Sequence, residues 1–150
     1  MLKANKGSAL VFSLIILGFL LVSALSVATI AVADKKSALS TEKSGISFQT
    51  ADSGIERVLQ TIYKKAPTGL ESLATKLGGG ASCRSGVVSF SVAQGNVKVF
   101  FYEGVEGKTL YTRCNNDATW RSTINKIKSV GTYANTTRVV EVSINPPSPP

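Results

Sequence analysis

An uncharged apolar stretch, from Ser8 to Ala33, restricts the possible folds of this chain more than any other feature of its sequence. All 17 Lys and Arg residues and all 9 Asp and Glu residues lie outside it. As a helix, its roughly 26 residues extend about 39 Å, which exceeds the roughly 30 Å hydrocarbon core of a bilayer. A helix also satisfies its backbone hydrogen bonds internally, as a lipid environment requires. Residues 8–33 are therefore expected to form a transmembrane helix.

The helical pattern continues beyond the apolar stretch, into residues 34–66. No Pro interrupts this segment, and its apolar residues recur at spacings of three and four, which predicts one buried helix face. The residues of this face are Phe48, Ala51, Ile55, Val58, Leu59 and Ile62. Pro67 and Gly69 are expected to end the helix. Residues 34–66 are thus predicted to be the amphipathic half of one long helix.

Residues 67–144 carry the signals of a short helix followed by antiparallel strands. The helix is expected at Glu71–Leu77, and a run of three Gly residues ends it. Alternation of apolar and polar residues predicts strands, with turns at Gln94-Gly95-Asn96, at Glu106-Gly107 and at Ala134-Asn135. The expected strands are Val88–Val92, Val97–Phe101, Leu110–Arg113, Ile124–Tyr133 and Thr137–Ile144.

The order of these elements predicts an α+β fold. A long N-terminal helix, with a membrane half and an amphipathic half, is expected to pack on an antiparallel sheet of four to five strands. Residues 145–150 form a Pro-rich tail, which cannot extend a sheet because Pro lacks the backbone donor.

Two cysteines, Cys83 and Cys114, are expected to form a disulfide. The sheet domain is small enough that its core alone would give marginal stability. The apolar segment also places this domain across a membrane, where disulfides persist. A bridge that closes a loop of about 30 residues adds about 3–4 kcal/mol in the chain-entropy model. The alternative is a pair of buried, unpaired cysteines.

The composition argues against an enzyme, a metal site and a nucleic-acid-binding surface. The chain has no His, and therefore no Ser-His or Cys-His pair for acid–base chemistry. Two separated Cys residues cannot fill a tetrahedral zinc site. The net charge is +8, but the positive residues are scattered, whereas nucleic-acid-binding faces are usually clustered. We expect no catalytic residue, no metal, no cofactor and no specific nucleic-acid partner.

Several segments, in this order along the chain, resemble parts of type IV pilins and pseudopilins. Lys6-Gly7-Ser8-Ala9-Leu10-Val11 resembles their class III signal peptide. The stretch from Gly45 to Glu56 resembles the helix of minor pilins of the PilX type and of the K-type pseudopilin of type II secretion. Residues 127–133 and 138–142 are similar to the end of such minor subunits.

The resemblance implies how the N-terminus is processed and assembled. Residues 1–7 would be a prepilin leader, which a prepilin peptidase removes by cleavage between Gly7 and Ser8, with N-methylation of Ser8. Most pilins carry Glu at the fifth mature residue, where it is thought to neutralise the amino terminus of a neighbouring subunit, but here that residue is Phe12. A buried ammonium without a partner is costly. The resemblance therefore implies a minor subunit at the tip or initiating end of a type IV pilus or a type II secretion filament.

The same resemblance implies partners and a location. The partners would be other pilin or pseudopilin subunits, the prepilin peptidase and the inner membrane. We expect a single-pass protein of the inner (cytoplasmic) membrane before assembly, and afterwards a subunit of an extracytoplasmic filament or of the cell surface.

Two other functions fit the sequence. Ala31-Val32-Ala33 has the form of an ordinary signal-peptidase site, so a secreted or membrane-anchored binding domain could be released after Ala33. Against this, the apolar region of about 24 residues is longer than the 7–15 residues usual for a signal peptide. The third possibility is a membrane-anchored protein without an assembly role, in which Phe12 is one more apolar residue of the anchor.

Overall fold

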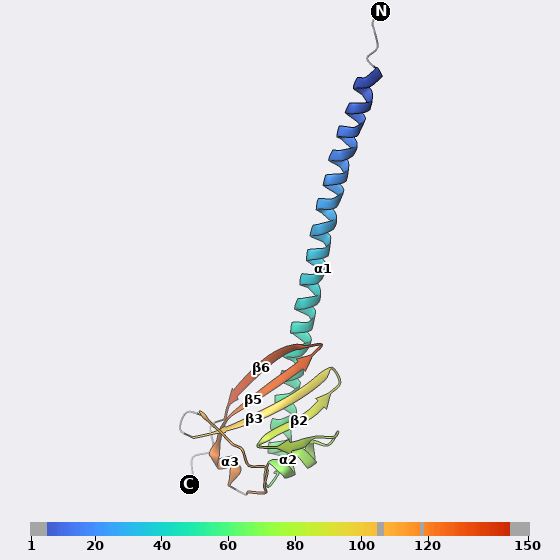
Figure 1. Ribbon diagram of the computed structural model, residues 1–150. Helices are drawn as coiled ribbons and strands as arrows, with labels where there is room; N and C mark the ends of the chain where they lie inside the picture. Colours follow the sequence, from blue (N-terminus) through green and yellow to red (C-terminus); the bar gives the residue numbers. More distant parts are fainter. Residues whose placement is uncertain (1–5, 105–106, 118, 145–150) are drawn as a thin grey trace, which may run out of the picture. The chain divides into compact units, whose positions relative to one another are not determined.

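The computed structural model describes residues 6–104, 107–117 and 119–144 (Figure 1). It divides the chain into two compact units, residues 1–41 and residues 42–150. Most of the predicted leader and the whole Pro-rich tail lie outside the described residues.

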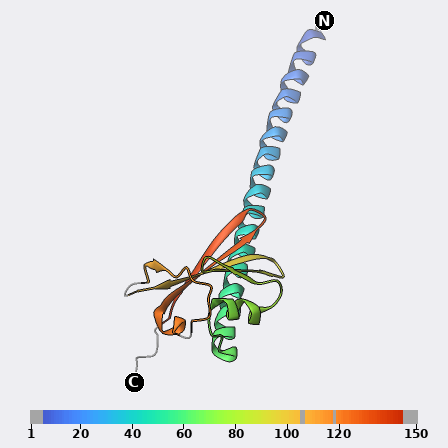
Figure 2. The ribbon, with the colours of Figure 1, turned by 60° about the horizontal axis from the view of Figure 1, so that its bottom comes forward.

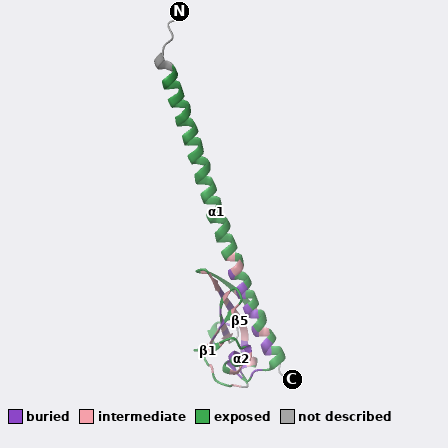
Figure 3. Ribbon diagram, turned by 90° about the vertical axis from the view of Figure 1, so that its right-hand side faces the viewer, coloured by how far each residue is buried: buried purple, intermediate pink, exposed green. Residues whose placement is uncertain are grey.

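One helix, α1 (Lys6–Lys65), runs through both units and is 60 residues long. In residues 9–41 every side chain is exposed, as the continuous green of Figure 3 shows. Within the described part of the chain, one helix is long and apolar enough to cross a membrane, and it covers Ala9–Lys65. The helix ends directly before Ala66 and Pro67, as the sequence predicts.

The second unit contains an antiparallel sheet beside the C-terminal part of α1 (Figures 1 and 2). The strand order is β1-β2-β3-β5-β6, and β4 pairs with β3. The strands are β1 (Ser82–Arg84), β2 (Val87–Val92), β3 (Gly95–Glu103), β4 (Thr109–Leu110), β5 (Ile124–Tyr133) and β6 (Thr136–Ser143). The predicted α+β class is therefore confirmed. The sheet has six strands rather than four to five because β1, with three residues, is too short to show an alternating pattern and was not predicted.

The turns and short helices agree with the sequence in part. Ala134 and Asn135 form the β5–β6 turn with φ of 45° and 65°, the left-handed pair that a tight two-residue hairpin requires. The β2–β3 turn is Ala93-Gln94, and Gly95 already pairs with Val92, so the predicted turn was one residue too late. The helix α2 (Leu70–Leu77) lies where a short helix was predicted, whereas the single turn α3 (Trp120–Thr123) was not predicted.

The core lies between the sheet, α2 and the inner face of α1. From α1 it receives Ala51, Ile55, Val58 and Ile62, four of the six residues predicted for that face. Leu59 is half-buried at its border. Phe48 was wrongly assigned to this face, because it is 52% exposed. The small polar residues Ser47 and Thr50 are buried instead, and they carry no apolar signal in the sequence.

Candidate assembly surfaces

The first candidate surface is the apolar part of α1 within residues 9–33. Its polar side chains do not need an external partner, because their hydroxyls donate to carbonyls of the same helix. These bonds run from Ser13 to Leu10, from Ser23 to Leu20, from Ser26 to Val22 and from Thr29 to Ser26. A helix with this arrangement presents only apolar groups and internally bonded hydroxyls, as lipid or neighbouring apolar helices require.

The residues predicted for processing and assembly lie at the start of this helix. Gly7 and Ser8 belong to the first turn of α1. Phe12 is 68% exposed and carries no charge. The structure therefore presents Phe12 as an accessible apolar side chain.

The second feature is the seam where α1 meets the end of the sheet formed by β5 and β6. Three hydrogen bonds cross this seam. They are Ser129 Oγ to Ala51 O (2.7 Å), Ser47 Oγ to Thr136 O (2.9 Å) and Arg138 Nε to Ser44 Oγ (2.7 Å). The first lies among fully buried residues, where a hydrogen bond is sheltered from competition with water. The seam therefore fixes the register of the helix on the sheet with polar as well as apolar contacts.

Two glycines allow the close approach of helix and sheet at this seam. A Cβ on Gly54 would lie 2.5 Å from Val97 Cγ1. A Cβ on Gly131 would lie 2.9 Å from Ala51 Cα, and closer still to Ala51 N and Ser47 O. Because no ordinary side chain fits at Gly131, the backbones of β5 and α1 can meet only if this residue is Gly.

The seam brings together two segments that lie far apart in the sequence. Residues 45–56 supply its helix side, and residues 127–133 supply its sheet side. The sequence alone did not predict that four small residues of these segments meet. They are Ser47, Gly54, Ser129 and Gly131. The available signal was the presence of small residues at strand and helix positions where larger apolar residues are usual.

A disulfide joins Cys83 of β1 to Cys114, with the Cα atoms 5.8 Å apart. This pairing excludes the alternative of two free thiols in the structure. The Cys114 carbonyl accepts a hydrogen bond from Glu71 N (3.1 Å) at the start of α2, and its sulfur accepts one from Gly86 N (3.3 Å). The bridge therefore ties the first turn of α2 and the β1–β2 turn to the segment that follows β4.

The segment after β4 also anchors the end of α1. Trp120 is buried, and its ring lies edge-on to Phe101 with centroids 6.0 Å apart. Both Trp120 Nε1 (3.2 Å) and an Arg121 guanidinium nitrogen (3.1 Å) donate to the Pro67 carbonyl, directly after α1. The predicted strand Leu110–Arg113 is shortened to Thr109–Leu110 because the chain turns inward here, toward Tyr111 and the disulfide.

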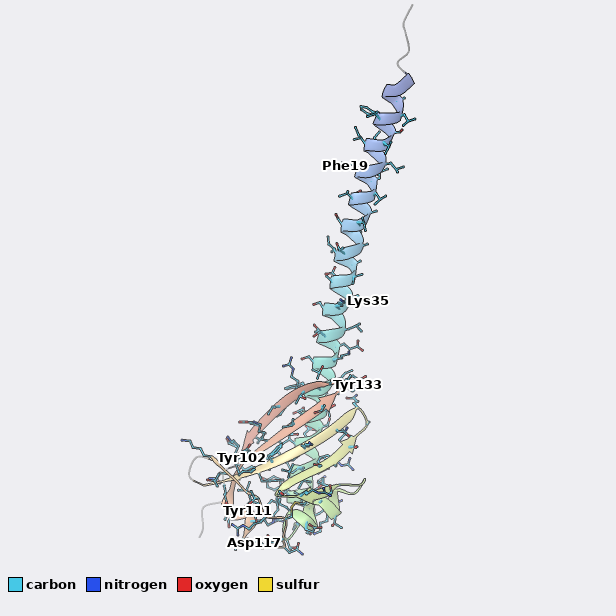
Figure 4. All side chains as sticks on the ribbon, viewed as in Figure 1. Phe19, Lys35, Tyr102, Tyr111, Asp117 and Tyr133 are labelled. Carbon is cyan, nitrogen blue, oxygen red and sulfur yellow. A yellow bond between two sulfur atoms is a disulfide. The ribbon has the colours of Figure 1, made fainter. Side chains whose placement is uncertain are left out.

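A small charged cluster lies in this region, where Figure 4 labels Tyr111 and Asp117. The hydroxyl and the N–H of Thr119 both donate to Asp117, and these bonds, with help from Arg113, hold the pKa of that carboxyl below its usual range. Burial, and then the charge of Asp117, raises the pKa of Tyr111. Arg113 lies between Glu103 (3.8 Å) and Asp117 (3.6 Å), so its charge is shared by two carboxylates. Such internal pairing indicates a structural rather than a reactive cluster.

No group of His, Cys, Asp or Glu within the described residues is arranged to hold a metal ion. The comparisons with known proteins agree with the geometry of the helix. Residues 6–56 match the family model described as PilX N-terminal. No curated protein and no solved structure matches the chain. The matched residues include the apolar helix and the helix side of the seam.

Proposed function

We propose that this chain is a pilin-like minor subunit at the tip or initiating end of a filament, and the match of residues 6–56 to the PilX N-terminal family model supports this proposal. The filament would be a type IV pilus or the related filament of type II secretion. The family match supports a minor-pilin role, and a long apolar helix on a small disulfide-linked domain suits a subunit that is anchored in a membrane and then assembled at the cell surface.

Phe12 carries the proposed position in the filament. If cleavage follows Gly7, Phe12 is the fifth residue of the mature chain, and no ionisable side chain lies between it and Asp34. An ammonium buried among apolar helices costs several kcal/mol unless a carboxylate pairs with it. This subunit cannot offer that carboxylate to a neighbour, so it begins or caps a stack more readily than it repeats within one.

Processing after Gly7 is tested first. The variant Gly7→Leu should leave the precursor uncut, and intact-mass measurement of the protein from membranes of its host should show it. Gly18→Leu is the matched control, because it adds the same side chain to the same helix at a site with open space around it. A Gly7→Leu variant that matures like the wild type would contradict the peptidase assignment. Cleavage after Ala33 in the wild type would instead support an ordinary secreted domain.

The tip position is tested by counting copies. Purified filaments should hold at most a few copies of the wild-type chain, located at one end by labelling. Phe12→Glu supplies the missing carboxylate and should raise the number of copies per filament. Phe19→Glu adds the same charge at a similarly exposed position seven residues further along the helix. This variant should not raise the number of copies per filament. Finding the wild-type chain as the main subunit along the shaft would refute the tip position, while leaving the pilin assignment intact.

A further inference from the structure

The outer face of the sheet, which points away from α1, is strongly basic. In each strand, alternate residues point away from the core, and the registers bring these residues together on one surface. Five of these outward-pointing residues are charged, four of them cations and one an acid. The cations are Arg84, Lys98, Lys126 and Lys128, and the acid is Glu141. We refer to this surface as the outer sheet face.

The single acid leaves most of this positive charge unbalanced. Glu141 is shared by Lys126 at 3.7 Å and Lys128 at 3.2 Å. Arg84 and Lys98 are exposed, and no described residue forms an ion pair with either of them. The outer sheet face therefore keeps a net positive charge that an acidic partner would complement.

The centre of the outer sheet face is apolar and aromatic. Phe100 and Tyr102 lie on the central strand β3, where Figure 4 labels Tyr102, and both are half-buried. Lys126 Nζ lies 5.0 Å from the centre of the Tyr102 ring. Val130 lies beside them, and its strand neighbour Val139 is 43% exposed. Aromatic and apolar residues surrounded by charge are typical of protein interfaces.

A surface of the opposite character lies on α1, within the same unit. Phe48, Asp52, Glu56, Leu59 and Tyr63 are spaced by four, four, three and four residues, so they follow one side of the helix. Phe48 and Tyr63 are 52% and 73% exposed. Neither of its two carboxylates forms an ion pair with a described residue. We call this surface the acidic flank.

The basic residues of α1 in this unit lie on a different side of the helix. Arg57, which follows Glu56 and therefore points about 100° away from it, turns toward α2. Its guanidinium donates to Leu77 O at 3.2 Å and lies 6.0 Å from the centre of the Phe90 ring. Lys64 lies a further seven residues along this side. The acidic flank is thus free of cations and carries exposed aromatic rings beside its carboxylates.

We infer that the outer sheet face of one copy of this chain binds the acidic flank of a second copy. The two surfaces are complementary in charge, and each brings apolar groups to the contact. They lie on opposite layers of the unit, since α1 covers the inner face of the sheet, and so they cannot meet within one copy. The contact is heterologous, with different surfaces on the two partners. This inference concerns the second unit alone, and it requires at least two copies side by side, which the few copies proposed for a filament end allow.

Charge reversal tests the pairing in the full chain held in detergent micelles. Sedimentation in a density-matched detergent should show association that weakens as salt is raised, because the pairing charges lie at the surface. Arg84→Glu with Lys98→Glu should weaken it at least tenfold, and so should Asp52→Lys with Glu56→Lys. Mixing the two double variants should restore it, because the reversed sheet face then meets the reversed helix flank. Lys43→Glu with Lys64→Glu is the control, with the same charge change at exposed residues outside both surfaces.

Cross-linking shows the contact directly and separates it from association through the apolar helix. A zero-length carbodiimide joins an amine to a carboxylate only where the two touch. It should link Lys98 of one isotope-labelled copy to Asp52 or Glu56 of an unlabelled copy, and high salt should reduce the product. A chain that stays monomeric, an association that neither reversal weakens, or reversed variants that do not restore each other would overturn the inference. So would saturable binding of an oligonucleotide by a monomeric chain, lost in the sheet-face variant, because the face would then be a polyanion site.

Discussion

Replacing Gly131 with Ala tests the close contact between α1 and β5 most sharply. The new Cβ would stand 2.9 Å from Ala51 Cα and closer to Ala51 N and Ser47 O, although non-bonded carbon contacts need about 3.5–4 Å. The atoms in the way belong to backbone on the helix side, so no side chain can rotate to make room. The helix must therefore move from the sheet by about 1 Å.

That movement has a cost that can be worked out from the seam. Forcing an extra methyl group into a packed interior costs about 1–3 kcal/mol. The bonds Ser129 Oγ to Ala51 O and Ser47 Oγ to Thr136 O, now 2.7 and 2.9 Å, would stretch beyond useful length, at about 1 kcal/mol each. The sum is about 3–5 kcal/mol. At about 4 °C for each kcal/mol, the melting temperature of the second unit should fall by roughly 12–20 °C.

The single tryptophan makes this measurement possible in the full chain. Trp120 is buried in the second unit, so its fluorescence reports the melting of that unit while the apolar helix stays in detergent. Gly45→Ala is the matched control, because it makes the same change in α1 where nothing lies within 4 Å. It should raise stability by up to about 1 kcal/mol through helix propensity. A Gly131→Ala variant that melts within a few degrees of the wild type would refute the close-contact argument.

Two further predictions concern the segment after β4. Replacing Cys83 and Cys114 together with Ser should lower the stability of the second unit by about 3–4 kcal/mol in the chain-entropy model, measured by the same fluorescence melt; an unchanged midpoint would contradict it. Thr119→Val should raise the pKa of Asp117, followed by carboxyl NMR titration, while Thr119→Ser should leave it low. Because the folded pKa is depressed, the stability from Asp117 is present above its ordinary pKa of about 3.9 and is lost as pH falls through the folded value, so the valine variant should lose less on acidification. Equal titration of the wild type and the valine variant would show that the hydroxyl is not the cause.

Much of the fold could be predicted because regular patterns repeat over several residues. The long helix, the hairpin of β5 and β6 and the alternation in β2 and β3 each repeat at least twice, so a periodic signal emerges. The strand β1 is too short to repeat and was not predicted, whereas β4 was predicted at Leu110–Arg113 and forms only Thr109–Leu110. Phe48 was misplaced because it lies near the border of the helix's inner face, where spacing alone cannot separate a core residue from one that is exposed.

The candidate surfaces also differ in how far the sequence could predict them. Phe12 was identifiable because it occupies a fixed place behind a recognisable motif, and the cysteines because there are only two. The seam and the outer sheet face depend instead on which residues the sheet brings together. Lys98 and Lys128, for example, are 30 residues apart in sequence, and both are set by β3–β5 pairing on one face. A one-residue change in that register would place the two lysines on opposite faces of the sheet.

The seam also shows why small residues, rather than large apolar ones, are required where this helix meets the sheet. A large apolar residue in a core can be exchanged for another of similar volume with repacking. Gly131 cannot be exchanged, because backbone lies against it, and Ser129 must keep both its size and its donor to reach the Ala51 carbonyl. On the helix side of the seam, a Cβ on Gly54 would clash with the side chains of Val97 and Ser129. A fold that brings a helix this close to a strand therefore demands particular small residues in two distant segments at once. The family match, which reaches Glu56, includes the whole helix side of this contact.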